Sequence, residues 1–142
     1  MADAKIRGVF RTVVFENAMR TCEYCKISEE YSVQPFVVDH IIPISKGGTD
    51  SLENLACACG GCNSYKHMYT VGIDLTEGVT TRLFHPRNDK WSEHFAWNPD
   101  FSLIIGVTAI GRATIETLRI NRLGLINIRK LLITAGQFPP QY

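Results

Sequence analysis

Apolar positions at helical spacing occupy the first stretch of the chain. The residues that follow this spacing are Ile6, Val9, Phe10, Val13 and Val14. Because apolar residues three and four positions apart share one helix face, the pattern predicts an amphipathic helix over about residues 4–20. Asp3 precedes this segment and fits the preference for aspartate at a helix N-cap.

The pattern changes to a short β-prone run at Phe36-Val37-Val38, which leads directly into Asp39-His40. Pro35 cannot donate to a strand ladder, so it confines this strand to a sheet edge or marks its start. The glycine-rich and polar stretch of residues 46–50 predicts a loop. The spacing of Asp50-Ser51-Leu52-Glu53 is that of a capping box, which predicts a helical turn before Asn54.

The rest of the chain alternates between short strands and helices. We expect a helix from Cys59 to about Met68, strands and loops over residues 71–106, and helices over about residues 108–121 and 125–135. Gly136 and the two prolines that follow it fit the end of a helix. Together these elements predict an α+β fold.

Composition narrows the class of protein. The chain has 142 residues, of which 45% are apolar and 20% charged, as is typical of one globular domain. We expect a single domain, with a core of about residues 20–70 and an extension of about residues 71–142 packed on it. No apolar run approaches the roughly 18 residues of a membrane span, and the first residues do not resemble a signal peptide. These features predict a cytoplasmic protein with no membrane contact. The net charge of +1 is low for a nucleic-acid binder, so any basic surface has to be local.

Four of the five cysteines form two pairs with the same spacing, Cys22-x-x-Cys25 and Cys59-x-x-Cys62. Each pair presents two thiolates from one tight turn, and two such knuckles complete the tetrahedral shell of a structural Zn²⁺ ion. Free buried thiols and a redox pair are the alternatives, and a redox pair has no βαβ context here. We interpret Cys57 as a small buried residue, with Cys57-x-Cys59 as an alternative chelate.

The segment that begins between the knuckles contains candidate residues for phosphodiester hydrolysis, a reaction that needs an activated water, a Lewis acid and positioning. His40 is the candidate general base, because the ordinary pKa of an imidazole is close to neutral. The Asp39 carboxylate and the Asn63 amide supply oxygen ligands that suit Mg²⁺ or Mn²⁺. Lys66 lies one helical turn after Asn63 and is a candidate phosphate contact, with a solvated lysine as the alternative.

The same segment resembles a known family. The residues that agree are Asp39-His40-x-x-Pro43-x-Ser45-x-Gly47-Gly48, then Asn54-Leu55, then Cys62-Asn63-x-x-Lys66. His40 and Asn54 are 14 positions apart, and Asn54 and Asn63 are nine positions apart. Residues 22–66 thus resemble the HNH endonucleases, which have a ββα-metal fold. The third named position is Asn63 instead of histidine, which is a common variant in members with zinc knuckles.

The resemblance implies a nuclease that acts on DNA and leaves 5′-phosphate and 3′-hydroxyl ends. It implies that His40 is the base, and that Asp39 and Asn63 hold one divalent cation. Adjacent residues of an extended strand point to opposite sides, so the resemblance also implies a bend at Asp39-His40. Asn54 corresponds to the residue that orients the loop bearing the base, although a plain turn residue is the alternative.

The expected nucleic-acid contacts are Lys66, Lys46 and Arg87. Further arginines at positions 112, 119, 122 and 129 predict a basic face that follows phosphates, and a solvated helix face is the alternative. Segments such as Phe84-His85-Pro86-Arg87 resemble a C-terminal extension of some HNH proteins, for which no chemistry is implied. We expect the aromatic residues Trp91, Phe95 and Trp97 to lie in the core, and His85 and His94 to be structural.

Two other functions are compatible with the sequence. One is a DNA-binding module that zinc stabilises and that has no turnover, although such a module has no need of the full set of candidate catalytic residues. The other is a nuclease effector that is active only with a partner. A cut in both strands by one such site per chain requires two chains, so a homodimer or a partner protein also stays open.

Overall fold

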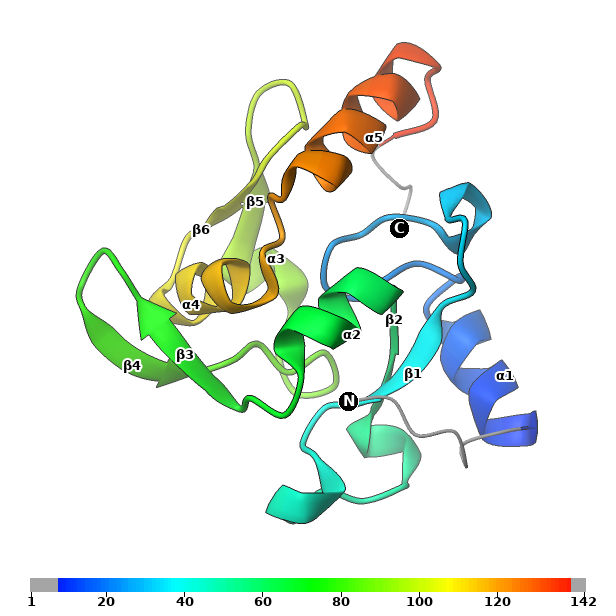
Figure 1. The fold of residues 1–142 in the computed structure, drawn as a ribbon, viewed down its shortest axis with the longest axis vertical. Helices are drawn as coiled ribbons and strands as arrows, with labels where there is room; N and C mark the ends of the chain where they lie inside the picture. The colour runs from blue at the N-terminus through cyan, green and yellow to red at the C-terminus, as the bar shows by residue number, and fades with distance from the viewer. Residues whose placement is uncertain (1–7, 139–142) are drawn as a thin grey trace.

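The structure, a computed structural model, describes residues 8–138 (Figure 1). Its helices are α1 (Gly8–Asn17), α2 (Gly60–Lys66), α3 (Trp91–His94), α4 (Ala109–Leu118) and α5 (Leu123–Thr134). Its strands are β1 (Val37–His40), β2 (Leu55–Ala58), β3 (Val71–Asp74), β4 (Val79–Arg82), β5 (Phe95–Trp97) and β6 (Ile104–Gly106). The fold is therefore α+β, as the sequence predicts.

The first half of the described chain is built around β1, β2 and α2. The two strands pair antiparallel, with Val37 opposite Ala58 and His40 opposite Leu55. Helix α2 follows β2 almost at once and packs against β1, while α1 packs against β2. This order of two antiparallel strands and a helix is the ββα arrangement that the resemblance implies. Figure 1 shows α2 between the β1–β2 hairpin on one side and α4 on the other.

The second half consists of two further antiparallel hairpins and three helices. Strand β3 pairs with β4, and β5 pairs with β6. Helix α4 contacts β3, β4, β6 and α2, so it links the later hairpins to the ββα unit. Gly72 of β3 permits this approach, because a Cβ there would overlap the side chain of Thr117.

One cluster of buried apolar side chains runs through both halves of the described chain. It contains Phe15 of α1, Tyr24 of the first knuckle, Val38 of β1, Phe95 of β5 and Leu132 of α5. The predicted core position is confirmed for Phe95, and Trp91 and Trp97 are partly buried and pack against this cluster. The later hairpins and helices thus share their core with the ββα unit.

Several boundaries differ from those expected. The first helix ends at Asn17, earlier than expected, because Met19 and Arg20 have positive φ angles of 51° and 50°. Residues 4–7 and the expected cap Asp3 lie outside the described residues. Helix α4 ends at Leu118, three residues before the expected end, where Arg119 takes a left-handed conformation.

The expected capping box at Asp50–Glu53 does not form. A 3₁₀ turn does precede β2, over Leu52–Asn54, but its N-cap is Ser51, whose side chain makes no capping hydrogen bond. Asp50 instead directs its carboxylate at His40. The prediction of a turn before Asn54 is confirmed, and the prediction of how it is capped is wrong.

Candidate active site

The four cysteines of the two knuckles meet in the core. Their Sγ atoms all lie within 4.8 Å of one another, and those of Cys25 and Cys59 are 3.7 Å apart. Sulfur atoms around a tetrahedral zinc ion are about 3.8 Å apart, given a Zn–S bond of about 2.3 Å. All four residues are buried, so the cluster fits a closed structural Zn²⁺ site. Cys57 is buried outside the cluster, and burial raises the pKa of its thiol, as expected of a small core residue.

The two knuckles have the same local geometry. In the first, the backbone N–H of Cys25 points at Sγ of Cys22 at 3.5 Å; in the second, the N–H of Cys62 points at Sγ of Cys59 at 3.4 Å. Cys59 is also the N-cap of α2. Each pair of ligands is therefore fixed by a backbone turn, and the second pair is continuous with the helix that bears Asn63.

Arg122 reaches the sulfur cluster from the later part of the chain. Its guanidinium nitrogens lie 3.5 Å from Sγ of Cys59 and 3.7 Å from Sγ of Cys62. Burial alone would lower the pKa of this guanidinium, but the negative charges of Cys62 and Cys59 raise it. Gly61 leaves room for the contact, because a Cβ there would overlap the guanidinium of Arg122.

Asp39 lies fully inside the molecule, with 0% of its surface exposed. The hydroxyl of Tyr24 donates to its Oδ2 at 2.7 Å, and Nζ of Lys66 lies 3.3 Å from its carboxylate oxygens. Burial, together with the charge of Asp39, raises the pKa of Tyr24 well above its usual range, so the phenol keeps the proton that it donates. Asp39 is thus held from two sides, by the first knuckle and by α2.

His40 belongs to the same strand but turns toward the loop that follows it. Its Nε2 lies 2.7 Å from Oδ1 of Asp50, and 1% of the residue is exposed. Asp39 and His40 are both within β1, and the chain bends only after His40, at Ile41 and Ile42. The implied bend at Asp39-His40 is therefore wrong: the strand stays regular, and alternation directs the two side chains to different partners.

Asn54 ties the ends of this loop together. Its Nδ2 donates to the carbonyls of Ile42 and Thr49, at 2.9 and 2.8 Å, and its Oδ1 accepts from the N–H of Ile42 at 2.9 Å. Gly48 makes this closure possible, because a Cβ there would overlap the carbonyl of Ile42. The contacts are those of a residue that sets the shape of the loop that follows His40.

Asn63 presents an oxygen that no donor in the described structure satisfies. Its Oδ1 is buried, and within residues 8–138 it has no hydrogen-bond partner. A buried acceptor without a donor is costly, and it needs an explanation such as an ion or a water. A hard oxygen ligand of this kind, on a helix packed against the strand of Asp39, fits a divalent cation.

The predicted nucleic-acid contacts have different surroundings. Lys66 is 1% exposed and donates to the carbonyl of His40 at 3.0 Å as well as to Asp39, so the predicted phosphate contact does not fit its placement. Arg87 pairs with Glu23. Lys46 is exposed, with Nζ 2.8 Å from the carbonyl of Met68 just after α2. Of the three, Lys46 keeps the placement that a phosphate contact requires.

The arginines of the later helices do not form one basic face. Arg112 pairs with Asp74 at 2.9 Å, and Arg129 is buried, donating to the carbonyl of Ile120 at 2.9 Å. Arg119 and Arg122 both lie over the ring of Tyr65. The predicted face that follows phosphates is wrong, because three of these guanidiniums have intramolecular partners of opposite charge or buried carbonyls to satisfy.

Comparison with known families supports the interpretation of this region. Residues 22–68 match the family model described as HNH endonuclease. These residues form an HNH domain. The match covers the two knuckles, the β1–β2 hairpin and α2, and stops before the later hairpins. No curated protein and no solved structure matches the chain.

Two residues of the HNH domain were not among the predicted site residues. Tyr24 lies between the first two cysteines, and only its place inside the knuckle could have marked it as a contact of Asp39. Asp50 was assigned to a helix cap, which is the usual role of aspartate before a turn. In both cases the partner is distant in sequence, so spacing alone does not indicate the contact.

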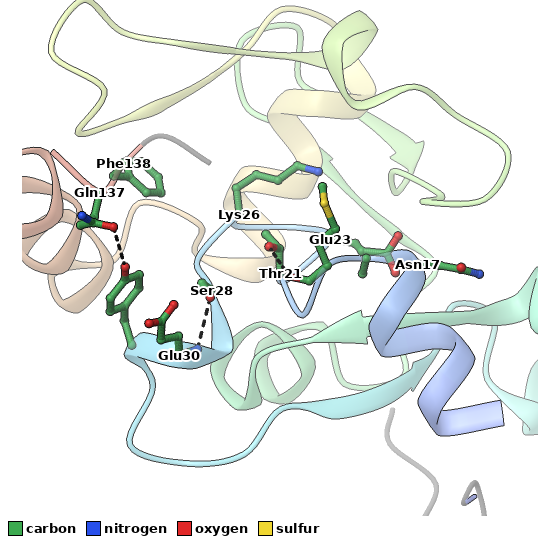
Figure 2. Close-up of a pocket in the computed structure, with 11 residues that line it drawn as sticks. Asn17, Thr21, Glu23, Lys26, Ser28, Glu30, Gln137 and Phe138 are labelled. Atoms are coloured by element: carbon green, nitrogen blue, oxygen red, sulfur yellow. Dashed lines mark hydrogen bonds between the residues drawn. The ribbon is translucent and has the colours of Figure 1, made fainter. Parts of the chain in front are cut away.

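A hollow of about 360 Å³ lies beside the first knuckle, and none of the predicted site residues lines it (Figure 2). Lys26 and Glu23 of the knuckle border it, and burial lowers the pKa of Lys26 and raises that of Glu23. Gln137 accepts from the hydroxyl of Tyr31 across it at 3.2 Å.

None of the helices within residues 8–138 has the length and apolar character of a membrane span.

Proposed function

We propose that the protein is a metal-dependent endonuclease that hydrolyses phosphodiester bonds in DNA. The proposal rests on one observation above all: Oδ1 of Asn63 is buried and has no hydrogen-bond partner among residues 8–138. This oxygen belongs to the same ββα unit as the imidazole of His40 and the carboxylate of Asp39, and both of these groups are held by hydrogen bonds. An HNH domain that only bound DNA would have no need to leave this oxygen without a donor.

His40 is the proposed general base. A water attacks phosphorus, the new O–P bond forms as the P–O3′ bond breaks, and the imidazole takes the proton of the water. The 3′-oxygen leaves with the electron pair of the broken bond and takes a proton from solvent. The products then have 5′-phosphate and 3′-hydroxyl ends. The loop that Asn54 closes keeps the imidazole in place, so little reorganisation is needed in the transition state.

Asp39 and Asn63 are the proposed ligands of one divalent cation, Mg²⁺ or Mn²⁺. When bound, the cation supplies a Lewis acid that stabilises the charge that develops on the phosphate. A carboxylate accepts about four hydrogen bonds or ligands, and Tyr24 and Lys66 are two of the groups that contact Asp39. The four cysteines hold a structural Zn²⁺ ion, and Lys46 is the proposed phosphate contact beside α2.

The test is cleavage of supercoiled plasmid by the purified zinc-loaded protein, with Mg²⁺, with Mn²⁺ and with neither. We expect relaxation or linearisation only with added divalent metal. His40→Ala removes the base, and His40→Gln keeps an amide N–H for Asp50 but no base, so both variants should lose activity. Asn63→Ala should require more metal for half-maximal activity, because one of the two protein ligands is lost.

The matched control is His85→Asn. Nδ1 of His85 accepts from the backbone N–H groups of Arg87 and Asn88, and the asparagine oxygen can do the same. This variant should cleave like the wild type. Zinc content and melting temperature are measured for each protein. Full activity in a folded His40→Gln variant would refute the assignment of the base, and a folded wild type without cleavage would leave the HNH domain as a binding module.

A further inference from the structure

We propose that Asp50 is a positioning residue for His40, and that it makes Nδ1 the nitrogen that accepts the proton. The inference rests on the proposed nuclease function. It adds a residue to the site, and it assigns the two imidazole nitrogens to different tasks. The observations are the contact between the two side chains, the way the loop is closed, and the difference in their exposure.

The contact joins two residues that the loop brings back together. Oδ1 of Asp50 lies 2.7 Å from Nε2 of His40, within the range of a short charge-assisted hydrogen bond. Two per cent of the His40 side chain is exposed, against 63% of the Asp50 side chain. The carboxylate therefore keeps contact with water, while the imidazole is enclosed and depends on the protein for its orientation.

The backbone fixes this contact from both ends. Asn54 binds Ile42, two residues after His40, and Thr49, the residue immediately before Asp50. The N–H of Ile41 also donates to the carbonyl of Asn54 at 2.9 Å. Since both ends of the loop are tied to Asn54, the distance between the imidazole and the carboxylate is set by the backbone as well as by the two side chains.

The chemistry of the two groups decides which nitrogen holds the proton. A carboxylate only accepts hydrogen bonds, and a neutral imidazole has one donor and one acceptor nitrogen. Oδ1 of Asp50 thus selects the tautomer with hydrogen on Nε2, and the lone pair lies on Nδ1. When Nδ1 takes a proton from the attacking water, the imidazolium is stabilised by the adjacent negative charge, as in hydrolases in which an aspartate orients a histidine.

The kinetic test compares Asp50→Asn and Asp50→Ala with the wild type on the same DNA substrate. Asparagine keeps an acceptor without the charge, and alanine removes both. We expect kcat to fall about 10-fold for Asp50→Asn and about 100-fold for Asp50→Ala, which does not exceed what general-base catalysis contributes, about 100- to 10,000-fold. KM and the metal concentration for half-maximal activity should not change, because the role proposed for Asp50 is confined to its contact with His40.

Glu53→Gln is the matched control, since Glu53 is an acidic residue of the same loop whose Oε1 accepts from the hydroxyl of Ser51. It should have the kcat of the wild type. Three results for Asp50→Ala overturn the proposal. The first is an unchanged kcat. The second is a higher kcat, which would mean that Asp50 blocks access to His40, and the third is a changed metal requirement, which would mean that Asp50 is a metal ligand.

A second readout does not depend on activity. Nitrogen NMR of the labelled protein reports which imidazole nitrogen holds the proton, and the signals of His40 are identified by their loss in His40→Gln. At about pH 8, the wild type and Glu53→Gln should show hydrogen on Nε2, because Oδ1 of Asp50 accepts from that nitrogen. Asp50→Ala should show a mixture of both tautomers.

The two readouts separate the two hypotheses. An inactive wild type with hydrogen on Nε2, lost in Asp50→Ala, refutes the nuclease function but supports the contact between the residues. An active wild type whose His40 tautomer is the same with and without Asp50 refutes the positioning role and leaves the nuclease function intact.

Discussion

The cysteine cluster and the proposed cation site share helix α2 but hold their ligands in different ways. The cluster has four buried sulfurs, each fixed by a backbone turn, with Arg122 against two of them. The proposed cation site has the buried Oδ1 of Asn63, which has no donor in the described part of the chain, and the carboxylate of Asp39, which contacts Tyr24 and Lys66. A structural metal site is closed by the protein, whereas a catalytic one keeps positions open for water and substrate. The comparison implies that loss of Zn²⁺ from the cysteine cluster unfolds the chain, whereas loss of the divalent cation from the proposed site only stops the reaction.

The largest effect that this contrast predicts is at the first knuckle. Cys22→Ser removes one of four ligands, and structural zinc contributes roughly 10 kcal/mol or more to the folding of small zinc domains. We expect loss of bound zinc and of the cooperative thermal transition. Cys57→Ala is the control, because Cys57 is buried outside the cluster, and it should keep both. A Cys22→Ser variant that melts like the wild type without zinc would show that the cluster is not structural.

A smaller effect is expected where Lys66 meets Asp39. Lys66→Met leaves a buried carboxylate without its ammonium partner, and breaking such a pair costs about 3–5 kcal/mol. Because a divalent cation would take the place of this charge, added Mn²⁺ should restore part of the lost free energy of unfolding. The exposed Lys46→Met variant should change neither quantity.

Urea unfolding of the zinc-loaded proteins, with and without Mn²⁺, measures both effects. Equal destabilisation of Lys66→Met in the two conditions would mean that Asp39 does not bind the cation. In that case a carboxylate other than Asp39 would have to be the ligand of the divalent cation.

The smallest of these effects concerns Arg122. Contacts of metal ligands with outer residues typically change metal affinity 10- to 100-fold, so Arg122→Gln should lose zinc to a coloured chelator at least about 10-fold faster. Arg119→Gln is a close control, because Arg119 stacks on the same Tyr65 ring without a sulfur contact. Equal release rates in the two variants would show that the contacts of Arg122 with Cys59 and Cys62 do not stabilise the cluster.

The sequence predicted those parts of the HNH domain that depend on local spacing. The two knuckles, the strand before Asp39 and the helix after Cys59 follow from residues a few positions apart, and the structure confirms them. Cys57 is buried outside the cysteine cluster, as predicted. The proposed roles of His40, Asn54 and Asn63 remain predictions, and the contacts of His40 and Asn54 explain how these two side chains are held.

The errors concern charged residues whose partners are far along the chain. Lys66 was expected on the surface but neutralises Asp39, 27 positions away. Arg122 and Arg129 were expected on a basic face, but they reach the cysteine knuckles from α5 and its N-cap. A periodic pattern shows which side of a helix is polar, but it does not show whether that side meets solvent, a thiolate or a buried carbonyl.

The central claim is that a water activated by His40 attacks phosphorus in DNA. It is tested most directly by cleavage of an end-labelled duplex in water enriched in the heavy isotope of oxygen, with Mg²⁺ or Mn²⁺. The account predicts that the heavy oxygen appears in the new 5′-phosphate, that the other new end is a 3′-hydroxyl, and that His40→Gln forms neither. No cleavage by the folded, zinc-loaded protein, or undiminished cleavage by His40→Gln, would contradict it.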